Sequence, residues 1–182
     1  MIIRLLVSGI DDGYFPVEYK KNRGKTTLVS VTYNGFKIYS IDFDLISVDG
    51  EDAGLVFEKL EKGDICILDG ITFGGFNYIN PDLIKTDYII FYSSRPNLAK
   101  VSSALIKHFN DNRKNVILNV MNNLLRISTK KGDVFIYTNI KVNEAKEIIE
   151  KYQVFDKIPE PLKTAHEISS SLSKFLLSKK II

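Results

Sequence analysis

Three strand-like segments joined by one tight turn open the sequence and restrict the folds that the chain can adopt. Residues 2–10 are mostly apolar, residues 27–33 are rich in β-branched side chains, and residues 36–48 alternate apolar with polar side chains. The dipeptide Asn34-Gly35 between the last two segments is a strong short-range signal for a β-hairpin. These features predict an antiparallel meander of three strands. A bulge is expected near Tyr39 and Ser40, because the apolar alternation changes phase there.

The rest of the chain alternates between helical and strand patterns. We expect helices over residues 51–62, 97–109 and 145–152 and from Pro159 onward, with a short helical turn over residues 81–85. Apolar runs at residues 64–69 and 87–93 are typical of buried parallel strands, and residues 116–120 and 133–138 are predicted as further strands. The order predicts a single α/β domain over residues 1–182, a mixed sheet of three antiparallel strands then parallel strands, with flanking helices.

Composition excludes several classes of protein. Of the 182 residues, 45% are hydrophobic and 26% are charged, and the single cysteine, Cys66, lies in an apolar run. We therefore predict a globular chain with a buried thiol, no internal disulfide and no cysteine-based zinc site. No apolar run reaches the ~18–20 residues of a membrane span and no secretory signal is visible, so we expect a cytoplasmic protein without a membrane partner.

Charge is unevenly distributed along the chain, although the net charge is only +3. Acidic residues outnumber basic ones up to Pro96, and the balance reverses after it. This asymmetry fits a carboxylate cluster that holds a divalent metal beside a surface that attracts phosphate. Solvated surface charge alone is the alternative explanation.

Aspartates stand where three predicted elements end. Asp11 follows the first strand, Asp69 ends the strand at residues 64–69, and Asp49 and Asp52 lie between the third strand and the first helix. Because functional groups gather at the carboxyl ends of neighbouring strands, we expect these carboxylates to converge on a site for Mg²⁺ or Mn²⁺. For each aspartate alone, turn chemistry or a helix cap is the alternative role.

The order of strands and acidic residues resembles the ribonuclease H-like nuclease arrangement. Short blocks at comparable spacing are similar to those of endonuclease V, and longer pieces resemble more closely an archaeal endonuclease V-like family of unknown function. The resemblance covers nearly the whole chain and implies an endonuclease V-like fold. The blocks that carry it are Gly9-Ile10-Asp11, Val48-Asp49-Gly50-Glu51-Asp52-Ala53, Leu68-Asp69-Gly70-Ile71-Thr72-Phe73 and Pro159-Glu160-Pro161-Leu162-Lys163-Thr164-Ala165-His166.

Carried over residue by residue, the resemblance implies a metal site with a phosphate contact beside it. Asp11 and Asp69 match its metal-binding aspartates, and Asp49, or else Asp52, stands where endonuclease V has a glutamate. His166 matches the fourth metal-site position, and Arg95 lies near the place of a lysine and can neutralise a phosphate. The alternative for His166 is a hydrogen-bonded core residue. The last helix is expected to turn inward a stripe of Leu162, Ala165, His166, Ser169, Leu172 and Leu176.

Two features of endonuclease V have no counterpart in this sequence. The wedge segment that separates DNA strands is missing between Asn34 and Asp49, and the histidine that follows the Asp-Gly block is absent. Phe73 and Phe76 stand there instead, and they can stack on unpaired bases or be buried against a helix. Among the basic residues of the C-terminal half, Lys130 and Lys131 can hold a nucleic-acid backbone by charge.

Two functions are compatible with these patterns. The first is metal-dependent hydrolysis of nucleic-acid phosphodiesters by a magnesium-dependent endonuclease, with DNA or RNA as the partner and the substrate unknown. The alternative is a non-catalytic nucleic-acid or protein binding module on a ribonuclease H-like frame. The missing wedge, histidine and glutamate favour the alternative.

Overall fold

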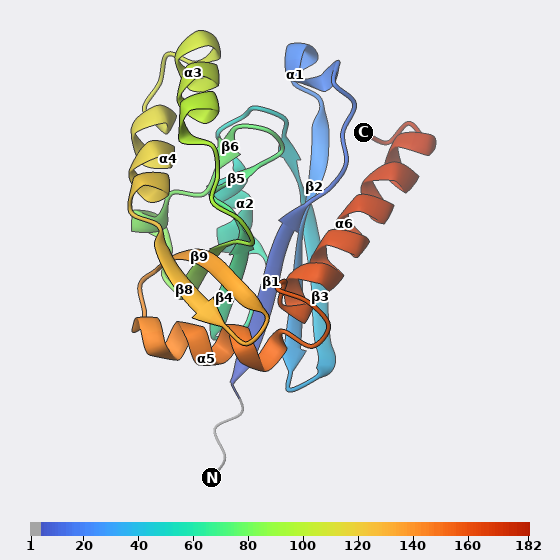
Figure 1. Cartoon of the computed structure of the whole chain (residues 1–182). Coiled ribbons are helices and arrows are strands. Elements are labelled where there is room, and N and C mark those ends of the chain that lie inside the picture. Colours follow the sequence, from blue (N-terminus) through green and yellow to red (C-terminus); the bar gives the residue numbers. More distant parts are fainter. Residues whose placement is uncertain (1–4) are drawn as a thin grey trace.

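The computed structural model describes residues 5–182, apart from the side chains of residues 21 and 22, and is built on a seven-stranded mixed sheet (Figure 1). The strand order is β3-β2-β1-β4-β7-β9-β8. Strands β1, β2 and β3 are antiparallel neighbours, and β4 and β7 run parallel to β1. Strand β9 is antiparallel to β7, and β8 is antiparallel to β9. The strands are β1 (Leu6–Asp12), β2 (Lys25–Asn34), β3 (Lys37–Ser47), β4 (Ile65–Asp69), β7 (Asp87–Tyr92), β8 (Leu125–Thr129) and β9 (Gly132–Thr138).

The predicted meander is confirmed. Thr32 pairs with Ser40 and Tyr33 pairs with Ile38, so Tyr39 is the extra residue of the expected bulge. Residues 2–4 of the predicted first strand lie outside the described residues. A one-turn helix, α1 (Tyr19–Asn22), stands in the polar segment between β1 and β2.

Helices cover both faces of the sheet (Figure 1). On one face, α2, α3, α4 and the small hairpin of β5 and β6 pack on side chains that include Ile10 and Leu68. On the other face, α5 and α6 pack on side chains that include Val7 and Ile67. These elements are α2 (Ala53–Lys59), β5 (Thr72–Phe73), β6 (Asn77–Tyr78), the 3-10 turn η1 (Pro81–Leu83), α3 (Leu98–His108), α4 (Arg113–Asn122), α5 (Val142–Tyr152) and α6 (Glu160–Ser178).

The strand predicted over residues 116–120 is wrong, because this segment belongs to helix α4. Its buried side chains Ile117, Val120 and Met121 follow the i, i+3, i+4 spacing of one helix face. A five-residue apolar run does not distinguish this face from a strand. The strand that pairs with β9 is instead β8, which the sequence patterns did not predict.

No helix among residues 5–182 is both long enough and apolar enough to cross a membrane. Cys66 is buried in the core, as expected, and burial raises the pKa of its thiol to about 12.

Candidate metal centre

Two aspartates and a histidine meet at the carboxyl ends of β1 and β4. Each of Asp11, Asp69 and His166 offers one ligand atom, and these atoms lie within 4.8 Å of one another. The sheet register explains the meeting of the two aspartates. Ile10 pairs with Leu68 in the parallel ladder, so the next residues along are Asp11 and Asp69. Side chains alternate along a strand, and both carboxylates therefore project to the face that α6 covers.

Helix α6 brings the histidine to this face because a glycine lets it approach the sheet closely. A Cβ atom on Gly9 would lie 2.1 Å from the Pro161 carbonyl oxygen, so only glycine fits under this turn of α6. Leu162 and Ala165 are buried on the sheet-facing side. His166 lies beside them, with its side chain 64% exposed at the edge of the sheet rather than inside the predicted inward stripe. Its Nδ1 atom is 2.8 Å from Asp11 Oδ2.

Burial and mutual repulsion perturb the carboxylates. Asp11 is only 3% exposed. Burial, followed by the charges of Asp69 and Asp12, raises its pKa from 3.8 to about 8. Burial also raises the pKa of Asp69. The hydrogen bond to Asp11 raises the pKa of His166, and the charges of both aspartates act in the same direction. The cluster therefore carries negative charge that a proton or a cation would relieve.

Asp12 is a further member of this region that the residue patterns did not single out. It points to the opposite face from Asp11, where its Oδ2 accepts a hydrogen bond from Gly74 N at 2.8 Å. Burial raises its pKa to about 6, and the charge of Asp69 adds to this effect. The pair Asp11-Asp12 at a strand end was the available signal. Alternation along β1 assigns only the first of the two to the face of the cluster.

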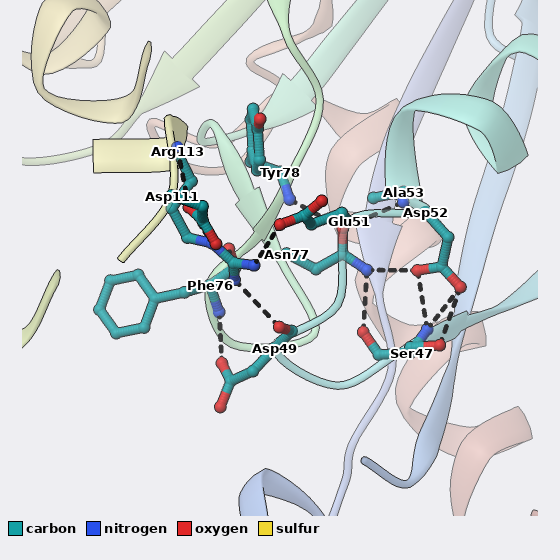
Figure 2. Close-up of polar contacts among 10 residues, drawn as sticks. All are labelled: Ser47, Asp49, Glu51, Asp52, Ala53, Phe76, Asn77, Tyr78, Asp111 and Arg113. Atoms are coloured by element: carbon teal, nitrogen blue, oxygen red, sulfur yellow. Dashed lines mark hydrogen bonds and ion pairs between the residues drawn. The ribbon is translucent and has the colours of Figure 1, made fainter. Parts of the chain in front are cut away.

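Asp49 and Asp52 do not join the cluster, in contrast to the expected convergence. Asp52 accepts hydrogen bonds from Ser47 N and Oγ and from Asn77 Nδ2, the last at 2.6 Å (Figure 2). It fastens the β3–α2 loop, and it makes no side-chain cap bond to α2. Asp49 accepts a hydrogen bond from Phe76 N at 2.7 Å. Both carboxylates therefore hold loops, the alternative that turn chemistry allowed.

A buried arginine, which the sequence patterns missed, connects three loops beside the site (Figure 2). Arg113 is 4% exposed, and its Nη1 donates to the carbonyl oxygens of Asp49 and Phe76 at 2.9 and 3.1 Å. Its Nε donates to Asp111 at 2.9 Å, and its Nη2 lies 3.2 Å from Glu51 Oε1. The position was missed because residues 116–120 were interpreted as a strand, which hides the buried start of α4.

The other predicted contacts fall into two groups. The expectation that Phe73 stacks on bases is wrong, because its side chain is fully buried in the core. Phe76 is partly buried and packs edge-on against Phe109, with ring centroids 5.5 Å apart. Arg95 is exposed just after β7, and Lys130 and Lys131 are exposed between β8 and β9. Since β9 runs antiparallel to β7, the β8–β9 turn lies at the same sheet edge as the carboxyl ends of β4 and β7.

A groove of about 510 Å³ opens beside the cluster. Asp69 and His166 line it together with Ile158 and the first turns of α6, which contribute Glu160, Lys163 and Glu167. A volume of this order is typical of small-ligand sites. The cluster is thus open to a ligand on the side of α6.

The fold is similar to that of endonuclease V. A Bacillus subtilis endonuclease V structure superposes with a TM-score of 0.60 at 8% identity, covering 96% of this chain and 83% of the other. An endonuclease V from Ciona intestinalis, in complex with DNA containing an inosine, gives a TM-score of 0.57 at 18% identity, with 94% and 86% covered. These likenesses confirm the predicted endonuclease V-like fold, a mixed sheet with flanking helices.

The sequence comparisons define the family. Residues 3–173 match the family described as endonuclease dU, and the chain belongs to it. A UPF0215 protein of Sulfurisphaera tokodaii is 61% identical over 98% of this chain and its own full length. A crystal structure of a protein of unknown function from Archaeoglobus fulgidus has a TM-score of 0.75 at 21% identity, with 92% and 98% covered.

Proposed function

We propose that the protein is a metal-dependent hydrolase of nucleic-acid phosphodiesters. The observation that carries this proposal is the meeting of Asp11, Asp69 and His166 within the reach of one ion. Two carboxylates on adjacent strands repel each other, and the raised pKa of Asp11 reflects that repulsion as well as burial. A hard divalent cation such as Mg²⁺ or Mn²⁺ takes oxygen ligands and would offset the charge. The donor set therefore fits the ion.

Each residue of the cluster has a role in the proposed reaction. Asp11 and Asp69 would hold the ion, which when bound lowers the pKa of a coordinated water and offsets charge on phosphate. Hydrolysis adds the oxygen of one water to phosphorus, breaks one P–O bond and passes one water proton to the leaving oxygen. His166, which is hydrogen-bonded to Asp11 and lines the groove, would hold that proton in transit. Arg95, Lys130 and Lys131 are proposed contacts to backbone phosphates.

The family description supplies the first substrate to test. It names dU, the notation for deoxyuridine, and one structural neighbour was solved with inosine-containing DNA. We therefore propose a nucleic acid that contains a deaminated base as the substrate. The residue patterns leave the choice between the two bases open, because the wedge and the loop histidine of endonuclease V are missing here.

A cleavage assay tests the proposal. End-labelled DNA strands containing one deoxyuridine, one deoxyinosine or neither, both single-stranded and paired, are incubated with Mg²⁺, Mn²⁺ or EDTA. We expect cleavage only with a metal ion, and we expect Asp69→Asn to lower its rate at least ~100-fold, since second-shell changes alone cost metal sites 10–100-fold. Asp87→Asn is the matched control, because Asp87 is exposed at the opposite end of the neighbouring strand β7. Metal-independent cleavage, or equal rates for the two variants, would refute the proposed site.

The alternative, a binding module, makes a different prediction in the same assay. Such a protein would bind the labelled strands but would cut none of them under any metal condition. Its supporting observation is that Asp49 stays outside the cluster, so that among residues 5–182 two carboxylates join the histidine.

A further inference from the structure

An exposed aromatic ring lies next to a lysine at the rim of the groove beside the metal centre. Phe155, in the loop between α5 and α6, is 78% exposed. The Nζ atom of Lys163 lies 5.3 Å from the centroid of its ring. Lys163 itself lines the groove together with Asp69 and His166, as does Ile158 of the same loop. One side chain therefore links the ring to the site.

Charge pairing decides what Lys163 can do there. Its Nζ lies 3.0 Å from Asp156 Oδ2 and 3.5 Å from Glu160 Oε1, so its charge is already balanced by two carboxylates. A lysine in this state is a poor phosphate ligand. It is well placed instead to hold the loop and to support one side of the Phe155 ring by a cation–π contact.

Two further lysines lie on this loop and on the turn that it contacts. Lys157 follows Phe155 in the loop, and its Nζ donates to the backbone oxygen of Asp133, at 3.3 Å. Its side chain also passes over Gly132, where a Cβ atom would lie 3.0 Å from Lys157 Cε. The α5–α6 loop thus abuts the β8–β9 turn that carries Lys130 and Lys131. Both Lys131 and Lys157 are exposed.

We propose that Phe155 is a stacking platform for an unpaired base of the nucleic-acid strand whose phosphodiester lies at the Asp11, Asp69 and His166 cluster. Lys131 and Lys157 contact the phosphates of the same strand. The assignment rests on the proposed function and extends it to the flanking part of the substrate.

The chemistry of the ring selects the kind of strand. A base that is stacked and paired inside a duplex offers no face to a protein ring, whereas an unpaired base does. Stacking on an aromatic side chain tolerates any base, since every base has a π face. The rim is therefore a site for single-stranded nucleic acid, and it adds affinity without adding sequence preference.

Binding in the absence of metal tests this assignment. The probe is a fluorescein-labelled oligodeoxythymidine strand, and its fluorescence anisotropy is measured in EDTA so that no cleavage occurs. We expect Phe155→Ala to weaken binding of the strand at least ~5-fold, the effect of losing one stacked base. Phe155→Trp should bind as the natural protein does. Phe155→Leu should be as weak as Phe155→Ala, because it keeps apolar volume but has no π face.

The same helix offers a matched control. Phe175, near the C-terminal end of α6, is 54% exposed, and Lys179 Nζ lies 5.8 Å from its ring centroid. It has the same chemistry, but its partner Lys179 does not line the groove as Lys163 does, so Phe175→Ala should leave binding unchanged. A double Lys131→Gln, Lys157→Gln variant should reduce the slope of log affinity against log salt concentration by an amount that corresponds to up to about two phosphate contacts.

Three results would overturn the assignment. They are unchanged binding by Phe155→Ala, equal weakening by Phe175→Ala, and full restoration by Phe155→Leu, which would indicate an apolar protein-docking contact. Failure here is distinguishable from failure of the proposed hydrolase. Metal-dependent cleavage with an inert Phe155 refutes only the rim site, whereas Phe155-dependent binding without cleavage under any metal condition refutes only the hydrolase.

Discussion

Neutralising one buried carboxylate should stabilise the metal-free protein at alkaline pH. The perturbation is Asp11→Asn, which keeps the size of the side chain and removes its charge. Asp11 titrates near 3.8 in an unfolded chain, and burial raises its pKa to about 8 in the folded state. The folded protein therefore holds more protons than the unfolded chain between these values, so its stability falls as pH rises through this window.

The size of the effect follows from the width of the window. One pH unit in which one extra proton is held corresponds to about 1.4 kcal/mol. Between pH 5 and pH 8 the folded protein without metal should lose about 4 kcal/mol through Asp11 alone. For a chain of this length that is a fall in melting temperature of roughly 8–16 °C. The raised pKa values of Asp12 and Asp69 act in the same direction and remain in the variant, whereas the raised pKa of His166 depends first on Asp11.

Thermal unfolding in EDTA at pH 5 and pH 8 measures the effect. At pH 5 the variant and the natural protein should melt at similar temperatures, and at pH 8 the variant should melt higher by most of the predicted difference. Adding Mg²⁺ at pH 8 should raise the melting temperature of the natural protein, because a ligand that binds only the folded state stabilises it. The variant should not respond. If Asp11→Asn instead melts lower than the natural protein at pH 8, charge repulsion at the cluster is not the controlling interaction.

Three further substitutions test the loop contacts, the approach of α6 to the sheet and the core. Arg113→Ala should destabilise the protein by about 3 kcal/mol, because it leaves two carbonyl oxygens and two carboxylates without their donor. Arg113→Lys should recover only part of this stability. A loss below about 1 kcal/mol in denaturant unfolding would contradict the role of Arg113 in holding the loops together. Gly9→Ala should displace α6 and abolish the Mg²⁺-dependent rise in melting temperature, because its Cβ atom would meet Pro161; an unaltered metal response would show that α6 tolerates the shift. Phe73→Ala should cost about 3–5 kcal/mol as a core truncation, and a near-neutral result in denaturant unfolding would contradict its place in the core.

Sequence patterns were sufficient to predict six of the seven strands of the large sheet, all except β8, and its central aspartates. The Asn34-Gly35 turn fixes the first hairpin, and the apolar run that ends at Asp69 is typical of a central parallel strand. Because neighbouring parallel strands end at one edge, the meeting of Asp11 with Asp69 follows from strand order. His166 follows from the resemblance rather than from periodicity, which predicted an inward position although the ring is mostly exposed.

The parts that could not be predicted depend on loop geometry. Asp49 and Asp52 are close to the strand end in sequence, yet their carboxylates bond to Phe76 N and to Ser47 and Asn77. No pattern in the sequence states which way a loop carboxylate turns. Arg113 bonds to backbone carbonyls of distant loops, and because every residue has a carbonyl, the sequence does not indicate which ones are its partners.

Direct titration with a divalent cation is the sharpest test of the metal centre. Isothermal titration of Mn²⁺ at pH 8 should detect a site in the natural protein and in Asp87→Asn. Asp69→Asn should lose that binding, because it leaves one carboxylate and one imidazole at the cluster. A natural protein that binds no Mn²⁺, or an Asp69→Asn variant that binds it with unchanged affinity, would contradict the account.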